Sequence, residues 1–360
     1  MEPPLRRRAA RPEGRRVVVS QQGVAQPPHD AGRRPARVVR VVQQAGRMKK
    51  ALRWVATIAV VTVLVVLVWQ RRDDLRPLWD DPSWDLALIA ALIVVGHFLN
   101  SSEFWVVYRA TGVRVGFFEN WMVFTAGLLG NLLPGQMGTI YKFRYMNAVH
   151  DVPYAKSGSN YGANLVISLG SSSIVGIIGV TAYAAGGGDF AWIVFAVFVA
   201  LGVACLALLR FPLPDWPLLR GKPARAAAAF NEGWHEIQRT PRTSLQVVVI
   251  DVVKYLLTAW RFQLAFGLLG VDESFWFFLV VAPAAAIAGI IAFTPGALGF
   301  RELFVTTAAV GMGSTLDDGL LAATTDRGVM LASAIVLGVA GYAYTVPRLR
   351  RANTTQPTPT

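Results

Sequence analysis

The chain has 360 residues, of which 54% are hydrophobic and 16% are charged, and its mean hydropathy is +0.43. Soluble domains carry about a quarter charged residues, so this composition excludes an ordinary soluble protein. The net charge of +13 does not indicate nucleic-acid binding, because much of it comes from residues 1–47, which contain eleven Arg and three acidic residues. This stretch is rich in Pro, Gly and Gln, and is predicted either as a disordered tail or as sequence upstream of a true start at Met48.

Beyond the tail, the sequence falls into apolar blocks of roughly the twenty residues that cross a bilayer. They lie at 52–69, 84–108, 117–133, 157–185, 190–210, 244–269, 274–293, 300–313 and 326–346. The first block could be a signal peptide, but its length and the Gln70-Arg71-Arg72 that follows favour an uncleaved span. We therefore predict an all-α fold, a polytopic membrane helix bundle over 48–350, with 351–360 as a second disordered tail.

Lys and Arg in short loops predict the orientation of the spans. Basic loops occur at the N-terminus, at Arg109 and Arg114, in the linker 211–243 and at the C-terminus, whereas the loops at Asp189, Asp272 and Asp317 contain no Lys or Arg. Both termini are thus predicted on the cytoplasmic side of the cytoplasmic (inner) membrane. Six full spans then remain, with two re-entrant hairpins that start near residues 117 and 274 and enter from opposite sides.

The two hairpins contain the same break, Pro134-Gly135-x-x-Gly138 and Pro295-Gly296-x-x-Gly299. Upstream, Gly112-Val113 with Phe117 recurs 158 residues later as Gly270-Val271 with Phe275. This pattern predicts an inverted repeat with halves 48–186 and 187–350. Pro and Gly break a helix and leave free N–H groups at a new helix N-terminus, and paired breaks at a repeat interface are typical of transporter binding sites.

Ionisable residues within the spans are expensive and are candidates for function or pairing. Glu103 and Arg261 occupy equivalent places in the two halves, and we hypothesise that they meet across the repeat interface. Asp251 and Lys254 are three residues apart and are expected to pair locally. Around the breaks, a predicted binding site for an anionic group comprises Pro134, Gly135, Gly138, Lys142, Arg144, Pro295, Gly296, Gly299, Arg301, Glu302 and Arg327, with Glu103 and Arg261. For Lys142 and Arg144, ordinary positive-inside anchoring is the alternative.

The sequence predicts no metal site, no cofactor and no catalytic residues, and we expect that the protein is not an enzyme. Its single cysteine, Cys205, excludes an intrachain disulfide. Ser171-Ser172-Ser173 could supply a nucleophile, but small residues in a span more commonly pack helices. The linker around Phe230 and Trp234 could form a short amphipathic surface helix.

The segments NLLPGQMGTIYKFRY and TPGALGFRE resemble the two signature regions of the lysylphosphatidylglycerol synthase/flippase transmembrane family, and the resemblance covers roughly residues 50–350. The positions that match are Asn131, Leu132, Leu133, Pro134, Gly138, Lys142, Pro295, Gly296, Gly299, Arg301, Glu302 and, at the start of the last span, Arg327. Gln136 and Thr139 depart from the Arg and Glu of the family pattern, and Ala163-Asn164 stands where members often have Glu-Arg. These departures leave open whether the chain acts on the usual substrate of the family.

The resemblance implies lipid translocation, or a role beside lipid or polysaccharide synthesis, because the soluble aminoacyl-transferase domain of some members is absent from this sequence. Our first hypothesis is a flippase-like carrier whose partner is a membrane lipid or lipid-linked molecule with an anionic headgroup. The alternative is a non-transporting accessory subunit that serves an envelope-synthesis enzyme. The sequence predicts no nucleic-acid partner, and it leaves the substrate, the coupling ion and the oligomeric state open.

Overall fold

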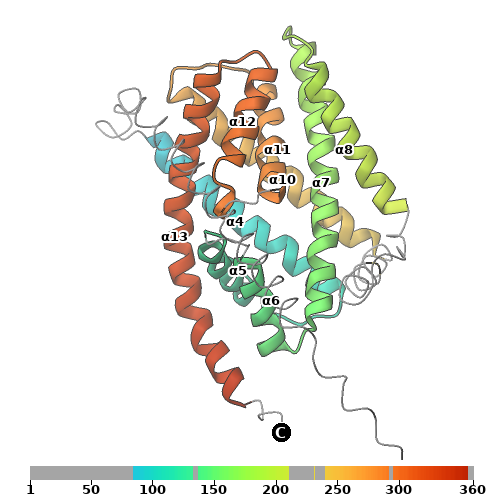
Figure 1. The fold of residues 1–360 in the computed structure, drawn as a ribbon, viewed down its shortest axis with the longest axis vertical. Helices are drawn as coiled ribbons and strands as arrows, with labels where there is room; N and C mark the ends of the chain where they lie inside the picture. The colour runs from blue at the N-terminus through green and yellow to red at the C-terminus, as the bar shows by residue number, and fades with distance from the viewer. Residues whose placement is uncertain (1–83, 133–136, 211–230, 232–239, 292–294, 356–360) are drawn as a thin grey trace, which may run out of the picture. The chain divides into compact units, whose positions relative to one another are not determined.

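The computed structural model describes residues 84–132, 137–210, 231, 240–291 and 295–355, which all belong to one compact unit, Leu52–Thr360. Every regular element in these residues is helical, which confirms the predicted all-α class (Figure 1). In chain order the elements are α4 (Trp84–Ala110), α5 (Phe117–Asn131), α6 (Met137–His150), α7 (Tyr154–Ala185), α8 (Trp192–Arg210), α10 (Pro241–Gly267), α11 (Phe275–Ile291), η1 (Pro295–Ala297), α12 (Phe300–Gly311) and α13 (Leu316–Thr355). The tail 1–47, the predicted span 52–69, the predicted linker helix, Pro134 and Gly135 lie outside the described residues.

Four described helices are long and apolar enough to cross a bilayer, namely α4, α7, α10 and α13. They correspond to four of the six predicted spans. A fifth predicted span, 190–210, forms α8, in which the apolar part is the shorter stretch Trp192–Leu208. α13 is longer than the predicted span 326–346, and at about 1.5 Å per residue it exceeds the roughly 30 Å hydrocarbon core. Its basic C-terminal turns therefore extend beyond the apolar region.

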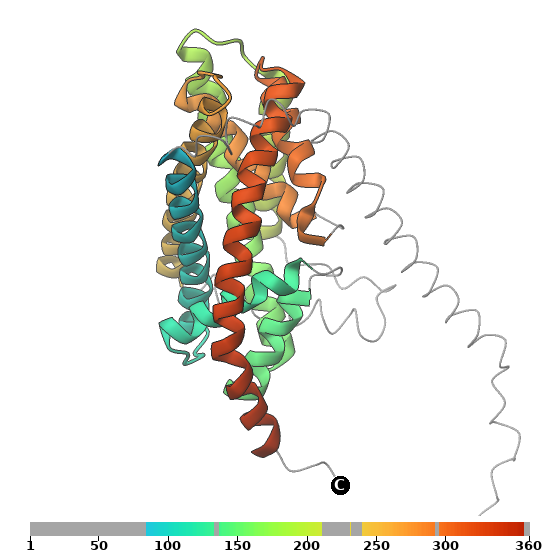
Figure 2. The ribbon, with the colours of Figure 1, turned by 90° about the vertical axis from the view of Figure 1, so that its left-hand side faces the viewer.

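The helices on either side of each Pro-Gly break are short. α5 and α6 have 15 and 14 residues, and α11 and α12 have 17 and 12. At about 1.5 Å per residue none of them reaches 30 Å, so each is too short to cross the hydrocarbon core alone. Figure 1 shows α5 and α6 in the lower half of the described bundle and α11 and α12 in the upper half, and Figure 2 shows the same separation beside the long α13.

The helix contacts follow one pattern in the two parts of the chain. α5 packs along α13, α11 packs along α7, and α4 packs against α10. Exchanging α4, α5, α6 and α7 for α10, α11, α12 and α13 returns most of the contacts among these helices, including those between α5 and α6 and between α11 and α12. The contact of α6 with α13 is the exception, because α12 does not pack comparably on α7. α5 and α6 thus lie beside α13 of the second part and α11 lies beside α7 of the first, whereas α12 packs on α11 and α13 of its own part.

The aligned Gly-Val-x-x-x-Phe segments have the same backbone conformation. Gly112 and Gly270 follow α4 and α10 with φ angles of 75° and 76°, a left-handed conformation that glycine adopts without a Cβ clash. In each case the next residue closes the turn: Val113 N–H donates to the Tyr108 carbonyl at 2.8 Å, and Val271 N–H donates to that of Phe266 at 3.1 Å. The following short helices begin at Phe117 and Phe275.

The serine cluster of α7 packs against α8. Ser173 Oγ donates to the Phe198 carbonyl at 2.6 Å, and Ser171 and Ser172 donate to carbonyls of their own helix. A Cβ added at Gly202 would lie 2.5 Å from Ser173 Oγ, so small residues allow the close approach. This confirms the helix-packing interpretation of the cluster.

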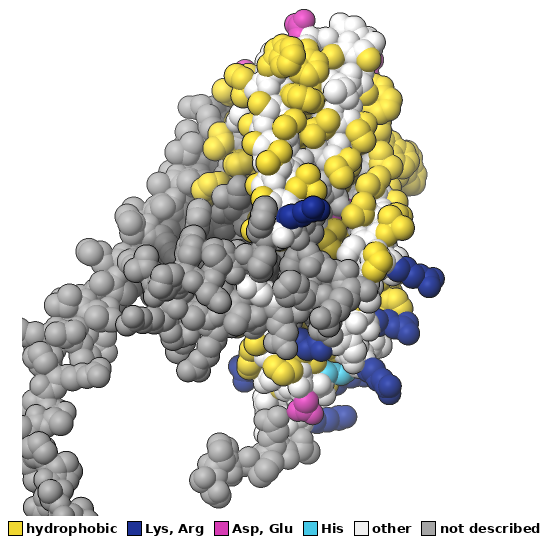
Figure 3. Space-filling view, turned by 90° about the vertical axis from the view of Figure 1, so that its right-hand side faces the viewer, with side chains coloured by type: hydrophobic (Ala, Val, Ile, Leu, Met, Phe, Trp, Pro, Cys, Tyr) yellow, Lys and Arg dark blue, Asp and Glu magenta, His cyan; other side chains and the backbone are white. Residues whose placement is uncertain are grey.

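Charged side chains are distributed unequally along the bundle. Figure 3 shows a face covered with hydrophobic side chains, with Lys and Arg gathered toward the end that carries the C-terminus. The exposed basic residues of the loops and helix ends at that end include Arg109, Arg114, Arg144, Arg348 and Arg351. The loops near Asp189, Asp272 and Asp318 connect the helices at the opposite end.

Candidate functional site

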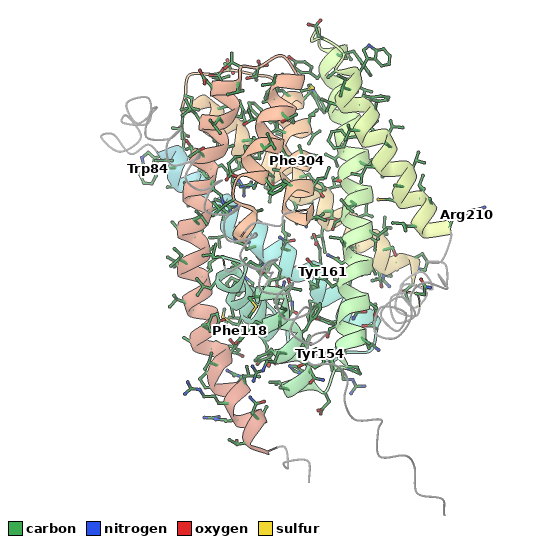
Figure 4. All side chains as sticks on the ribbon, viewed as in Figure 1. Trp84, Phe118, Tyr154, Tyr161, Arg210 and Phe304 are labelled. Carbon is green, nitrogen blue, oxygen red and sulfur yellow. The ribbon has the colours of Figure 1, made fainter. Side chains whose placement is uncertain are left out.

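A cavity of about 330 Å³ lies between the helices, among α4, α5, α6, α7, α10, α11, α12 and α13. Its charged or titratable lining side chains are His97, Glu103, Lys142, Tyr161, Lys254, Tyr255, Arg261 and Arg301. Asn100, Asn131 and Asn164 also line it, and Tyr161 is labelled on α7 in Figure 4. A polar cavity of this size inside an otherwise apolar bundle has the dimensions of a small-molecule or headgroup site.

Close packing of glycines brings α5 and α6 together beside the first break. A Cβ added at Gly138 of α6 would lie 1.8 Å from the Gly127 carbonyl oxygen of α5, and one at Gly130 would lie 2.5 Å from Gly138 Cα. Only glycine permits this backbone contact. Gly138 thus has the role in backbone approach that the motif predicts, and Asn131 at the end of α5 contributes to the cavity wall.

The second break is held by contacts to α13. Gly296 has a φ of 58°, and its carbonyl oxygen accepts a hydrogen bond from the Arg327 guanidinium. Arg327 Nε also lies 3.7 Å from Glu302 Oε1, and Glu302 Oε2 accepts from the N–H of Gly299 at 2.7 Å. Glu302 therefore satisfies a free N–H group at the start of α12. Arg327 and Glu302 do not line the cavity, so both support the break.

The two breaks lie next to each other in the structure. A Cβ added at Gly296 would lie 3.4 Å from Leu132 Cδ2 and 3.7 Å from the Asn131 carbonyl oxygen. The repeat motif therefore brings together segments about 160 residues apart, as the paired-break interpretation requires.

Arg261 and Arg301 share one carboxylate. Arg261 Nε lies 2.5 Å from Asp326 Oδ1 and Arg301 Nη1 lies 2.8 Å from Asp326 Oδ2, and all three side chains are buried. Both arginines line the cavity. Two guanidinium groups balanced by one carboxylate leave an excess positive charge at this end of the cavity, which favours an anion.

The predicted pairing of Glu103 with Arg261 is wrong. Glu103 Oε1 instead lies 2.5 Å from Lys254 Nζ, and Arg261 pairs with Asp326. The predicted local pair is present, because Asp251 Oδ1 lies 2.9 Å from Lys254 Nζ. Lys254 and Arg261 are seven residues apart on α10, two helical turns, so the glutamate meets the nearer of the two cations.

Lys142 and Arg144 have different surroundings. The Lys142 ammonium lies in the cavity, 4.6 Å from the Phe124 ring centroid and 5.1 Å from that of Phe104, and it forms no ion pair with any described residue. Arg144, two residues on, is exposed. Anchoring by positive charge at the membrane surface therefore explains Arg144 and does not explain Lys142. Of the predicted charged residues, Glu103, Lys142, Arg261 and Arg301 line the cavity, Glu302 and Arg327 lie at the second break, and Arg144 is exposed.

Sequence reasoning paired Asp251 with Lys254 and assigned neither this pair nor Asp326 to the site. It also missed the polar lining residues His97, Asn100, Asn131 and Asn164. A helical spacing could have found two of them, because His97, Asn100 and Glu103 follow one another at three-residue steps on one face of α4. Within the described residues, no three His, Cys, Asp or Glu side chains are grouped as a metal site would require.

The long apolar helices, with a cavity lined by polar side chains between them, define a multi-pass helical membrane protein. Residues 54–338 match the family described as the lysylphosphatidylglycerol synthase TM region, and the chain therefore belongs to this family. The match covers the cavity and both breaks and confirms the resemblance seen in the signature segments. No curated protein sequence matches the chain.

Proposed function

We propose that this protein is a flippase, which moves a lipid or lipid-linked molecule with an anionic headgroup across the cytoplasmic membrane without being an enzyme. The observation that carries the proposal is the cavity lined by Lys142, Arg261 and Arg301 with a single carboxylate, Asp326, at the arginines. Family membership supports a role in lipid handling. A phosphate diester would take the place of the missing counter-charge between Lys142 and the arginines.

An inverted repeat with two re-entrant hairpins is the architecture that we propose for this movement. The matched turns at Gly112 and Gly270, the largely matching helix contacts and the adjacent breaks all support it. A site at the interface of two inverted halves can face either side of the membrane when one half tilts against the other. By the positive-inside rule, the basic end with the C-terminus lies in the cytoplasm.

Reconstitution into liposomes tests the proposal. Acyl-labelled phosphatidylglycerol, a monoanionic lipid, and acyl-labelled phosphatidylcholine should be incorporated, and a membrane-impermeant quencher should report the fraction in the outer leaflet. We expect protein-dependent movement of phosphatidylglycerol that exceeds that of phosphatidylcholine. If neither lipid moves faster than in protein-free liposomes, the flippase proposal fails for these headgroups, and co-purification with an envelope-synthesis enzyme becomes the test of an accessory role.

Lys142→Gln should lower the rate of phosphatidylglycerol movement at least about tenfold, because one charge-assisted contact to the headgroup is worth about 1.5–3 kcal/mol. Arg144→Gln is the matched control, since it removes the same charge two residues away at an exposed position, and it should leave the rate within about twofold of the wild type. Equal rates in both variants would exclude Lys142 as a headgroup contact.

A further inference from the structure

A second charged cluster adjoins the cavity, which two of its three side chains line, and it has no part in the proposed anion site. It consists of Glu103 on α4 with Asp251 and Lys254 on α10, and we name it the acidic cluster. Lys254 Nζ donates to Glu103 Oε1 at 2.5 Å and to Asn100 Oδ1 at 2.9 Å, and it forms an ion pair with Asp251 Oδ1 at 2.9 Å. Two carboxylates and an amide oxygen within 2.9 Å of Nζ suit an ammonium group, so we treat Lys254 as charged.

The acidic cluster has one carboxylate too many for a single ammonium. The Glu103 and Asp251 side chains are both fully buried, and with both ionised the cluster would carry a buried net charge of −1. Asp251 Oδ1 also accepts from Ser168 Oγ at 3.1 Å, whereas Asp251 Oδ2 has no hydrogen-bond partner in the described part of the chain. An uncompensated carboxylate at this depth costs several kcal/mol, and two carboxylates that share one site commonly keep one proton.

Asn164 of α7 can form a hydrogen bond with Glu103 whether the Glu103 carboxylate is ionised or protonated. Its Nδ2 donates to Glu103 Oε2 at 3.4 Å, while its buried Oδ1 has no partner, and the side chain lines the cavity. An amide can donate to an ionised carboxylate and, after turning over, accept from a protonated one. The unused amide oxygen therefore supplies an acceptor for a proton on Glu103.

The surrounding helices do not neutralise the acidic cluster. Among the described residues, α7 contributes Ser168, Asn164 and Tyr161 to this part of the cavity and no ionised side chain, and α10 adds Tyr255. The other charged or titratable groups that face the cavity are His97 on α4, Lys142 on α6, Arg261 on α10 and Arg301 on α12. Arg261 is seven residues from Lys254, about 10 Å along α10, and is already paired with Asp326.

We propose that the acidic cluster binds a proton that moves together with the lipid, which makes the protein a proton–lipid symporter. This rests on the proposed function, because it assigns the coupling ion of the same cavity. The proton binds to the excess carboxylate of Glu103 and Asp251, while the headgroup anion binds at the arginines. A monoanionic headgroup and one proton together carry no net charge, so the pair crosses the bilayer without the cost of moving an ion. We propose a proton and not a metal cation, because the Lys254 ammonium already occupies the place between the two carboxylates where a metal cation would bind.

Infrared titration of the purified protein tests proton binding without any transport. The wild type should show the C=O band of a protonated carboxylic acid at pH 7. Asp251→Asn and Glu103→Gln should each remove it, because the remaining carboxylate then pairs alone with Lys254 and ionises. Asp318→Asn, which changes a half-buried aspartate outside the cavity at the start of α13, should retain the band. Absence of the band in the wild type would overturn the proposal and leave lipid movement untouched.

Liposomes with a gradient of one pH unit test the coupling. For one proton per lipid, phosphatidylglycerol should become about tenfold enriched in the leaflet that faces the alkaline side. Asp251→Asn should lose the enrichment, and Asp318→Asn should show the same enrichment as the wild type. Wild-type movement that ignores the gradient would refute the symport and preserve the flippase proposal. No lipid movement in the wild type would refute both.

Discussion

Asp326→Ala should abolish the stable folded protein or lower its thermal midpoint strongly in detergent. The substitution removes the single carboxylate that pairs with Arg261 at 2.5 Å and with Arg301 at 2.8 Å, and leaves two buried guanidinium groups without a counter-charge. Removing one partner of a buried ion pair typically costs about 3–5 kcal/mol, and here two cations lose their partner. Size-exclusion chromatography of a fluorescent fusion, with a heating series, measures the loss.

Two further variants separate this cause from a general sensitivity of α13. Asp318→Ala removes a half-buried aspartate of the same helix, whose carboxylate accepts from Thr315 Oγ1 at 2.6 Å, and should lower the midpoint much less, because one such hydrogen bond contributes about 0.5–1.5 kcal/mol. Adding Arg301→Met to Asp326→Ala should restore part of the stability, because it removes one of the two unpaired charges. A double variant no more stable than Asp326→Ala would show that charge balance is not what Asp326 provides.

Gly138→Ala should separate α5 from α6 and eliminate lipid movement. The new Cβ would lie 1.8 Å from the Gly127 carbonyl oxygen and 2.5 Å from Asn131 Oδ1, and backbone cannot yield as a flexible side chain can. Overpacking usually costs about 1–3 kcal/mol, and a clash between two backbones belongs at or beyond the upper end. Thermal denaturation and the phosphatidylglycerol assay are the measurements.

Glycines whose surroundings leave room for a methyl group provide a control, because their replacement should change the thermal midpoint in the opposite direction. Gly158 in α7 and Gly328 in α13 have no atom within 4 Å of an added Cβ. Replacing glycine by alanine inside a helix stabilises by about 0.5–1 kcal/mol when nothing is displaced, so Gly158→Ala and Gly328→Ala should raise the thermal midpoint slightly. If Gly138→Ala also raised it, the contact between Gly138 and Gly127 would not exist in the folded protein.

Local patterns in the sequence predicted much of the helical framework. Apolar length located α4, α7, α10 and α13, because roughly twenty apolar residues span the hydrocarbon core regardless of their neighbours. The Gly-Val-x-x-x-Phe repeat located two identical turns, because a left-handed φ at Gly112 and Gly270 is a property of the residue itself. The Pro-Gly motifs likewise marked where the short helices end.

Local patterns in the sequence could not predict which charged residues pair with each other across helices. The positions of Glu103 and Arg261 in the repeat suggested that they pair, yet Glu103 bonds to Lys254 and Arg261 to Asp326. A helical period specifies which residues share a face, and does not specify which face of another helix it meets. The register of α4 against α10 and of α10 against α13 selects among several cations of similar chemistry.

The sequence by itself thus determined a membrane-embedded helical protein, its family and the two breaks, because span length, glycine conformation and proline geometry act within a few residues. Only the tertiary structure decided that Lys142 faces the cavity while Arg144 faces outward, that Asp326 balances two arginines, and that Glu103 and Asp251 share one lysine. Those facts depend on contacts between residues up to about 150 positions apart. The balance of charge in the cavity, and with it the proposed coupling of a proton to an anionic lipid, follows from those contacts.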